Sequence, residues 1–102
     1  MNAIKLVITN SVNDEERIKW FFYNTEEERV SIETEMKKEQ DEWNSGGVAM
    51  GYMSKRYYSF KNYTLSDLLT MNISELEGMT VKDFLIVIMS ANELIQFIKG
   101  DN

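Results

Sequence analysis

The first pattern in the chain is an alternation over Ile4–Thr9 that places Ile4, Leu6 and Ile8 on one face. Every second residue from Ile4 to Ile8 is apolar, and this period of two in β-branched residues predicts a strand over Ile4–Thr9. The run Arg17–Asn24 is open to two interpretations. Its aromatic density favours a strand, whereas a helix opened by Asn13 is the alternative.

The next run, Val30–Lys37, alternates over eight residues and predicts a half-buried antiparallel strand. Asn24–Glu28 would then be the hairpin loop that joins it to the preceding strand. A helix is the alternative, because Thr25 and Glu28 form a capping-box pattern. In that helix three apolar residues would share one face: Ile32, Met36 and Trp43.

Beyond this run, Lys38–Gly47 is polar and ends in two glycines, which predicts a mobile loop. A further strand is expected around Arg56–Phe60, where aromatic residues are dense. From Thr64 onward the pattern becomes helical. Ser66–Leu69 suits a short helix, and Ser74–Glu77 is a capping box that Gly78 soon ends.

A long helix is predicted from the Thr80–Asp83 capping box to about Lys99, with a stop at Gly100. Its apolar residues recur at spacings of four and three: Phe84, Ile88, Ala91, Ile95 and Ile98. A stripe of this width can lie across a sheet. The sequence therefore predicts an α+β fold in one domain, residues 1–102. Three or four antiparallel strands (3–60) would be packed by C-terminal helices (64–99).

Composition excludes several kinds of chemistry. The 102 residues include no cysteine and no histidine, so disulfides, thiolate metal sites and the usual nucleophile–base pairs are excluded. Glu33 and Glu35 would lie on one side of the predicted strand, roughly 6–7 Å apart. In so charged a run both carboxylates should stay ionised, which is unsuited to acid–base catalysis. We therefore expect neither an enzyme nor a cofactor.

Two loops have a partial likeness to ligand-binding motifs. Asp41–Gly46 has an acid and a glycine at calcium-loop positions, but Trp43 stands where a ligand belongs. Gly46–Gly51 has the glycine spacing of a phosphate loop without the following lysine. Neither predicts a site. The first ten residues lack a signal-peptide pattern, and no apolar run is long enough to span a bilayer, so a cytoplasmic protein without a membrane partner is expected.

The net charge of −6 belongs to one segment. Residues 13–42 hold eleven acids and five bases, whereas the rest of the chain is neutral. On a hairpin, these carboxylates would project at spacings near those of nucleic-acid phosphates and attract a basic protein surface. A solvated face that maintains solubility is the alternative. The predicted partner-binding residues are Glu26, Glu27, Glu28, Glu33, Glu35, Glu39, Asp41, Glu42 and Trp43.

A small acidic chain without catalytic residues is similar in general character to phage or mobile-element inhibitors and to immunity proteins. Some of these mimic nucleic acid and block nucleases or CRISPR effectors. The leading hypothesis is therefore an inhibitor, of anti-CRISPR, anti-restriction or immunity type, that docks onto a basic partner protein. A structural subunit of a larger assembly is another hypothesis. The sequence leaves monomer and homodimer open.

The one basic cluster lies in Lys55–Tyr63, interleaved with aromatic residues that can stack on bases. It resembles the RNP1 element of RNA-recognition motifs, and Leu6–Asn10 has a trace of RNP2. Tyr57 and Lys61 depart from the RNP1 pattern. The resemblance implies single-stranded nucleic-acid binding as an alternative, although the acidic charge argues against free nucleic acid as a partner. That site would comprise Lys55, Arg56, Tyr58, Phe60, Lys61 and Tyr63.

Overall fold

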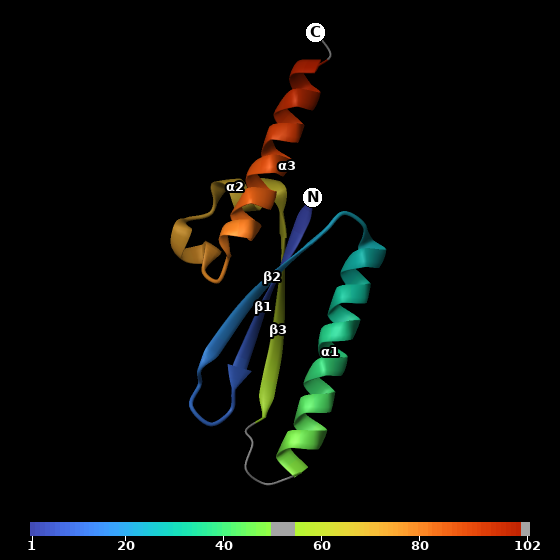
Figure 1. The fold of residues 1–102 in the computed structure, drawn as a ribbon, viewed down its shortest axis with the longest axis vertical. Helices are drawn as coiled ribbons and strands as arrows, with labels where there is room; N and C mark the ends of the chain where they lie inside the picture. The colour runs from blue at the N-terminus through green and yellow to red at the C-terminus, as the bar shows by residue number, and fades with distance from the viewer. Residues whose placement is uncertain (50–54, 101–102) are drawn as a thin grey trace.

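The computed structural model describes residues 1–49 and 55–100. Its elements are β1 (Asn2–Asn10), β2 (Glu16–Tyr23), α1 (Glu26–Ala49), β3 (Arg56–Thr64), α2 (Leu65–Thr70), the short 3-10 helix η1 (Ile73–Leu76) and α3 (Val81–Gly100). The strands of this described part form one antiparallel sheet in the order β2-β1-β3 (Figure 1). The predicted α+β class is confirmed, with a sheet of three strands.

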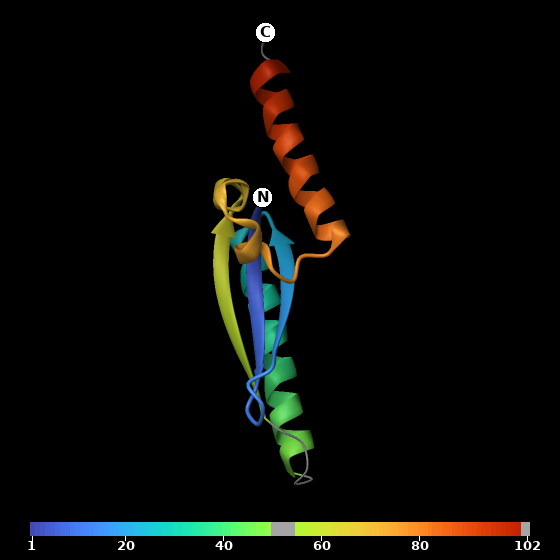
Figure 2. The same cartoon turned by 90° about the vertical axis from the view of Figure 1, so that its left-hand side faces the viewer.

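The central strand β1 contributes buried side chains to both faces of the sheet. Ile4 and Leu6 have no exposed surface and lie on one face, and Ala3, equally buried, lies on the other. Figure 2 shows α1 running along one face of the sheet. This is the face of Ile8, because Ile8 is paired with Tyr58, whose hydroxyl reaches α1. The alternation predicted for β1 is therefore confirmed.

Residues 30–37 form part of α1, so the predicted strand is wrong. Thr25 Oγ1 accepts a hydrogen bond from the Glu28 amide at 3.2 Å, and the Glu28 carboxylate accepts one from the Asn24 amide at 3.0 Å. These bonds satisfy amides at the helix start, where Glu26, Glu27 and Glu28 also suit the helix dipole. Val30, inward in a strand, is 48% exposed. The predicted mobile loop at residues 38–47 is wrong too, because α1 continues through it.

The second face of the sheet is covered by α2, η1 and the start of α3. A buried cluster of Ala3, Trp20, Leu68 and Val87 forms its core. Trp20 Nε1 donates to the Glu77 carbonyl at 2.9 Å, which fixes the turn after η1 against β2. Gly78 in that turn has a φ of 84°, and a Cβ there would lie 2.6 Å from the Cβ of Ile18. Only glycine fits both the backbone and the space.

The long helix α3 begins where predicted, at a capping box between Thr80 and Asp83, but it does not lie across the sheet. Figures 1 and 2 both show it projecting beyond the end of the sheet. Among its described side chains only Val87 is buried. The predicted packing of the apolar stripe on the sheet is therefore wrong. The Cα radius of gyration is 16.8 Å, whereas a compact domain of this length has about 13 Å.

Candidate functional site: the outer face of α1

All the predicted partner-binding acids lie on α1 rather than along a hairpin. The helix carries eight acids and three bases, a net charge of −5, so it holds most of the negative charge. On a helix, residues 35 and 42 are separated by about 10.5 Å along the axis, and 27 and 35 by about 12 Å. The predicted phosphate-like spacing depended on a hairpin and is wrong. What α1 offers is an acidic helical face.

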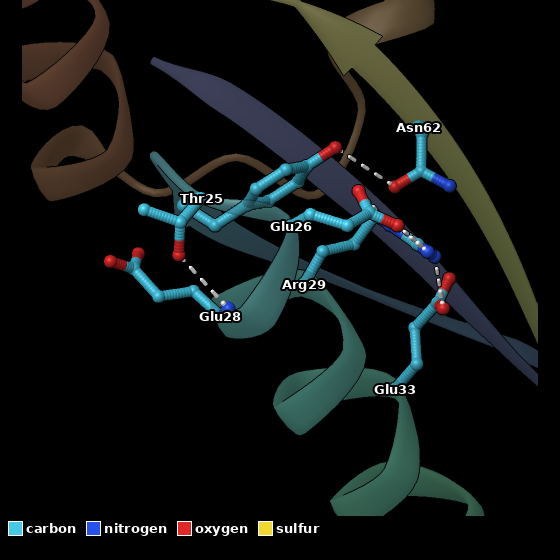
Figure 3. Close-up of polar contacts among 7 residues, drawn as sticks. Thr25, Glu26, Glu28, Arg29, Glu33 and Asn62 are labelled. Atoms are coloured by element: carbon cyan, nitrogen blue, oxygen red, sulfur yellow. Dashed lines mark hydrogen bonds and ion pairs between the residues drawn. The ribbon is translucent and has the colours of Figure 1, made fainter.

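Arg29 compensates two of these acids. Its Nη1 donates to the Glu33 carboxylate at 2.5 Å and its Nε donates to Glu26 at 2.9 Å. Figure 3 shows the Arg29 guanidinium between the two carboxylates. The hydrogen bond from Arg29 holds the pKa of Glu26 below its usual range, and it raises the pKa of Arg29. The three groups together keep a net charge of −1, so Arg29 halves the negative charge that these two acids present to a partner.

Glu39 and Trp43 join α1 to β3. The Tyr58 hydroxyl donates to the Glu39 carboxylate at 2.8 Å, and the Arg56 guanidinium lies 3.4 Å from the centroid of the Trp43 ring. Burial raises the pKa of Tyr58, and its hydrogen bond to Glu39 raises it further. Both predicted partner-binding residues thus have a role in the fold. Trp43 is half-buried against Arg56.

Two amide side chains of α1 bind the backbone of β3, an edge strand. Gln40 accepts a hydrogen bond from the Tyr58 amide at 2.6 Å. Asn44 accepts one from the Arg56 amide at 2.8 Å and donates one to the Arg56 carbonyl at 2.9 Å. Side chains four residues apart share a helix face, so both reach the same strand. They satisfy backbone groups that an edge strand otherwise leaves open.

The remaining acids define the surface that we call the α1 acidic face: Glu27, Glu35, Asp41 and Glu42. All four are exposed. Of these four described acids, only Glu42 has an ion pair, with Lys38 Nζ at 4.0 Å. Both side chains of that pair are more than two-thirds exposed, so the pair adds little stability and leaves the carboxylate available. The carboxylate of Glu28 is also exposed, but it accepts a hydrogen bond from the Asn24 amide at the helix start.

A shallow hollow of about 260 Å³ lies on this face. It is lined by Glu35, Met36, Lys38, Glu39 and Glu42. The hollow thus combines an apolar methionine with three carboxylates and one ammonium group, and of the carboxylates Glu39 is bonded to Tyr58 and Glu42 is paired with Lys38. The excess of carboxylates can accept an arginine or lysine side chain whose apolar stem contacts the methionine. Across the described residues, no cluster of three or more acids has the arrangement of a metal site.

The alternative nucleic-acid site does not form one open surface. Tyr58 and Phe60 face α1, where Lys37 Nζ lies 5.8 Å from the centroid of the Phe60 ring. In the RNP1 pattern these two rings would have to be open for stacking. Tyr63 and Lys61 lie on the opposite face, and Tyr63 packs against Trp20 with centroids 5.7 Å apart. Lys55 precedes β3, at the far end of the strand from Tyr63, and Arg56 is held by Trp43.

The structure also places the paired glutamates and the two segments that partly resemble ligand-binding loops. Glu33 and Glu35 lie on different sides of α1, because residues two apart on a helix do not face one another. The calcium-like segment Asp41–Gly46 is helical. Part of Gly46–Gly51 lies outside the described residues. None of the described helices is long and apolar enough to cross a membrane.

No protein-family model matches the sequence, and no curated protein or solved structure shows a recognisable similarity to it.

Proposed function

We propose that this chain is a cytoplasmic binding protein, not an enzyme, whose α1 acidic face docks onto a basic surface of a partner protein. The observation that carries the proposal is the hollow around Met36, where three carboxylates outnumber the single ammonium group of Lys38. Carboxylates set around an apolar floor give a cationic side chain both charge and contact, and they accelerate association with a positively charged protein.

The scaffold keeps this face presented in one orientation. Gln40 and Asn44 fix the second half of the helix to β3, and Arg29 bonds to two acids of the same helix within its first turns. The side chains of the α1 acidic face are not part of the core, so their charges are available to a partner. Blocking a site that normally holds nucleic acid is the proposed action, as in inhibitors of the phage anti-defence or immunity type.

The test reverses charge on this face and on a matched surface elsewhere. Glu35→Lys with Glu42→Lys changes the net charge from −6 to −2. Glu75→Lys with Glu77→Lys makes the same change near η1, where both side chains are exposed and the hydrogen bonds of both residues are made by backbone atoms. Circular dichroism of each variant establishes that it is folded.

Each tagged protein is incubated with lysate of its native host, and the captured proteins are identified by mass spectrometry. We expect wild type and the η1 variant to retain the same partner, and the α1 variant to lose it. Heparin, a soluble polyanion, should release that partner because it competes for the same basic surface. Equal capture by all three proteins, or capture unaffected by heparin, would contradict the proposal.

A further inference from the structure

The segment Met71–Met79, which we call the η1 clasp, joins the C-terminal helices to the sheet. It contains η1, none of whose residues is buried. The clasp backbone accepts two hydrogen bonds from the sheet. Trp20 Nε1 donates to the Glu77 carbonyl at 2.9 Å, and Lys5 Nζ donates to the Glu75 carbonyl at 3.2 Å. Apolar contact between the clasp and the sheet therefore depends on a few partly exposed side chains.

A methionine stands at each end of the clasp. Met71 and Met79 pack against the buried cluster that contains Trp20, and both remain partly exposed. Within this described segment, Leu76 is the only other side chain in that contact. Ile73, by contrast, is 84% exposed. The clasp is thus held on the core largely by two thioether side chains that solvent can reach.

The thioether of methionine is open to a change that other apolar side chains resist. A peroxide transfers one oxygen atom to the sulfur: the O–O bond breaks, an S–O bond forms, the sulfur loses two electrons, and the second oxygen leaves as water. The product is a polar sulfoxide. At Met71 or Met79 this group would face the apolar cluster, whose one polar side-chain group, Trp20 Nε1, is already bonded to Glu77. Burial without a partner is costly, so the sulfoxide should withdraw into water.

Met1 packs against the same cluster, but its surroundings differ. Its Sδ accepts a hydrogen bond from Ser90 Oγ at 3.2 Å, and the residue lines an open hollow of about 570 Å³. A sulfoxide oxygen at this position could accept the same bond and stay hydrated. Oxidation should therefore be tolerated at Met1 and disruptive at the two ends of the clasp.

We infer that Met71 and Met79 form an oxidation site that controls the attachment of α3 to the sheet. The helix begins two residues after Met79, and among its described side chains only Val87 is buried, so few other contacts retain it. Reduction of the sulfoxide reverses the change: a dithiol supplies two electrons and two protons, becomes a disulfide, and the oxygen leaves as water. Because α1 lies on the other face of the sheet (Figure 2), the inference does not depend on the proposed function of that helix.

Hydrogen exchange followed by mass spectrometry tests the site. Wild type is treated with dilute hydrogen peroxide until sulfoxides are located at Met71 and Met79. Exchange of the amides of residues 65–100 should then accelerate about tenfold or more, because an unpartnered polar group favours local opening. Exchange in α1 should stay unchanged. Met71→Leu with Met79→Leu, folded by circular dichroism, should keep its protection after the same treatment. Met36→Leu with Met89→Leu removes two thioethers elsewhere and should respond as wild type does.

Reversal and partial variants complete the test. Methionine sulfoxide reductases specific for each epimer, supplied with a dithiol, should restore the slow exchange of oxidised wild type. Met71→Leu and Met79→Leu made singly each keep one thioether of the clasp, and each should show a smaller acceleration than wild type. Unchanged exchange in oxidised wild type, equal acceleration in the double leucine variant, or acceleration throughout α1 would overturn the inference. Failure of the reductases to restore protection would also contradict it.

Discussion

Asn44→Ala should weaken the attachment of α1 to the sheet. The substitution removes two hydrogen bonds, to the Arg56 amide and to the Arg56 carbonyl, at 2.8 and 2.9 Å. Each such bond contributes about 1 kcal/mol net, and the two backbone groups would be left part-buried without their partner. Water reaches this edge, so we expect a loss of about 2 kcal/mol in the free energy of unfolding rather than the full desolvation penalty.

Asn92→Ala is the matched control. Asn92 is also in the middle of a helix but is exposed, so both substitutions gain the same helix propensity, up to about 0.7 kcal/mol. The difference between the two variants isolates the contacts with β3. In urea unfolding followed by circular dichroism, at one protein concentration, the midpoint for Asn44→Ala should lie lower by roughly 1–2 M. Equal midpoints for the two variants would refute the argument that Asn44 anchors α1.

Two further substitutions and one pH series test the fold and its charges. Gly78→Ala should cost about 2 kcal/mol, because of its positive φ and the 2.6 Å approach to Ile18. Gly46→Ala has open space on a helix and should raise the free energy of unfolding by about 0.5–1 kcal/mol. Urea midpoints that shift in the same direction for both glycine variants would contradict this expectation. The pKa of Glu26 is lowered by its hydrogen bond from Arg29, so its contribution to stability is present above the ordinary pKa of 4.5 and is lost as pH falls through the lower folded value. The stability advantage of wild type over Glu26→Gln should therefore disappear in acid, and an advantage independent of pH would count against the pairing.

The sequence predicted β1 correctly because only one period fits its alternation. Residues 30–37 satisfy both periods, since Ile32 and Met36 fall on one face of a strand and also on one face of a helix. The helix is fixed by the Thr25 cap, a local signal already visible as a capping-box pattern, and by the bonds of Gln40 and Asn44 to β3. The bonds to β3 depend on tertiary structure, which a periodicity cannot supply.

The candidate site, too, could be predicted only in part. The sequence identified the acidic segment, yet it could not separate acids that are paired from acids that are open. Glu33 and Glu35 look equivalent in the sequence, but Glu33 binds Arg29 whereas Glu35 lines the hollow. The apolar spacing of α3 was also visible in the sequence. Its predicted role was wrong because the stripe alone does not say whether a sheet or another helix will cover it.

The salt dependence of partner affinity tests the central claim most directly. The partner captured from the host lysate is purified and titrated calorimetrically with wild type, with the Glu35→Lys, Glu42→Lys variant and with the η1 variant, at several salt concentrations. We predict that wild-type affinity falls steeply with salt, and that the α1 variant binds about tenfold more weakly or worse at low salt. The η1 variant should stay close to wild type. Equal affinities and equal salt slopes for all three proteins would contradict binding through the α1 acidic face.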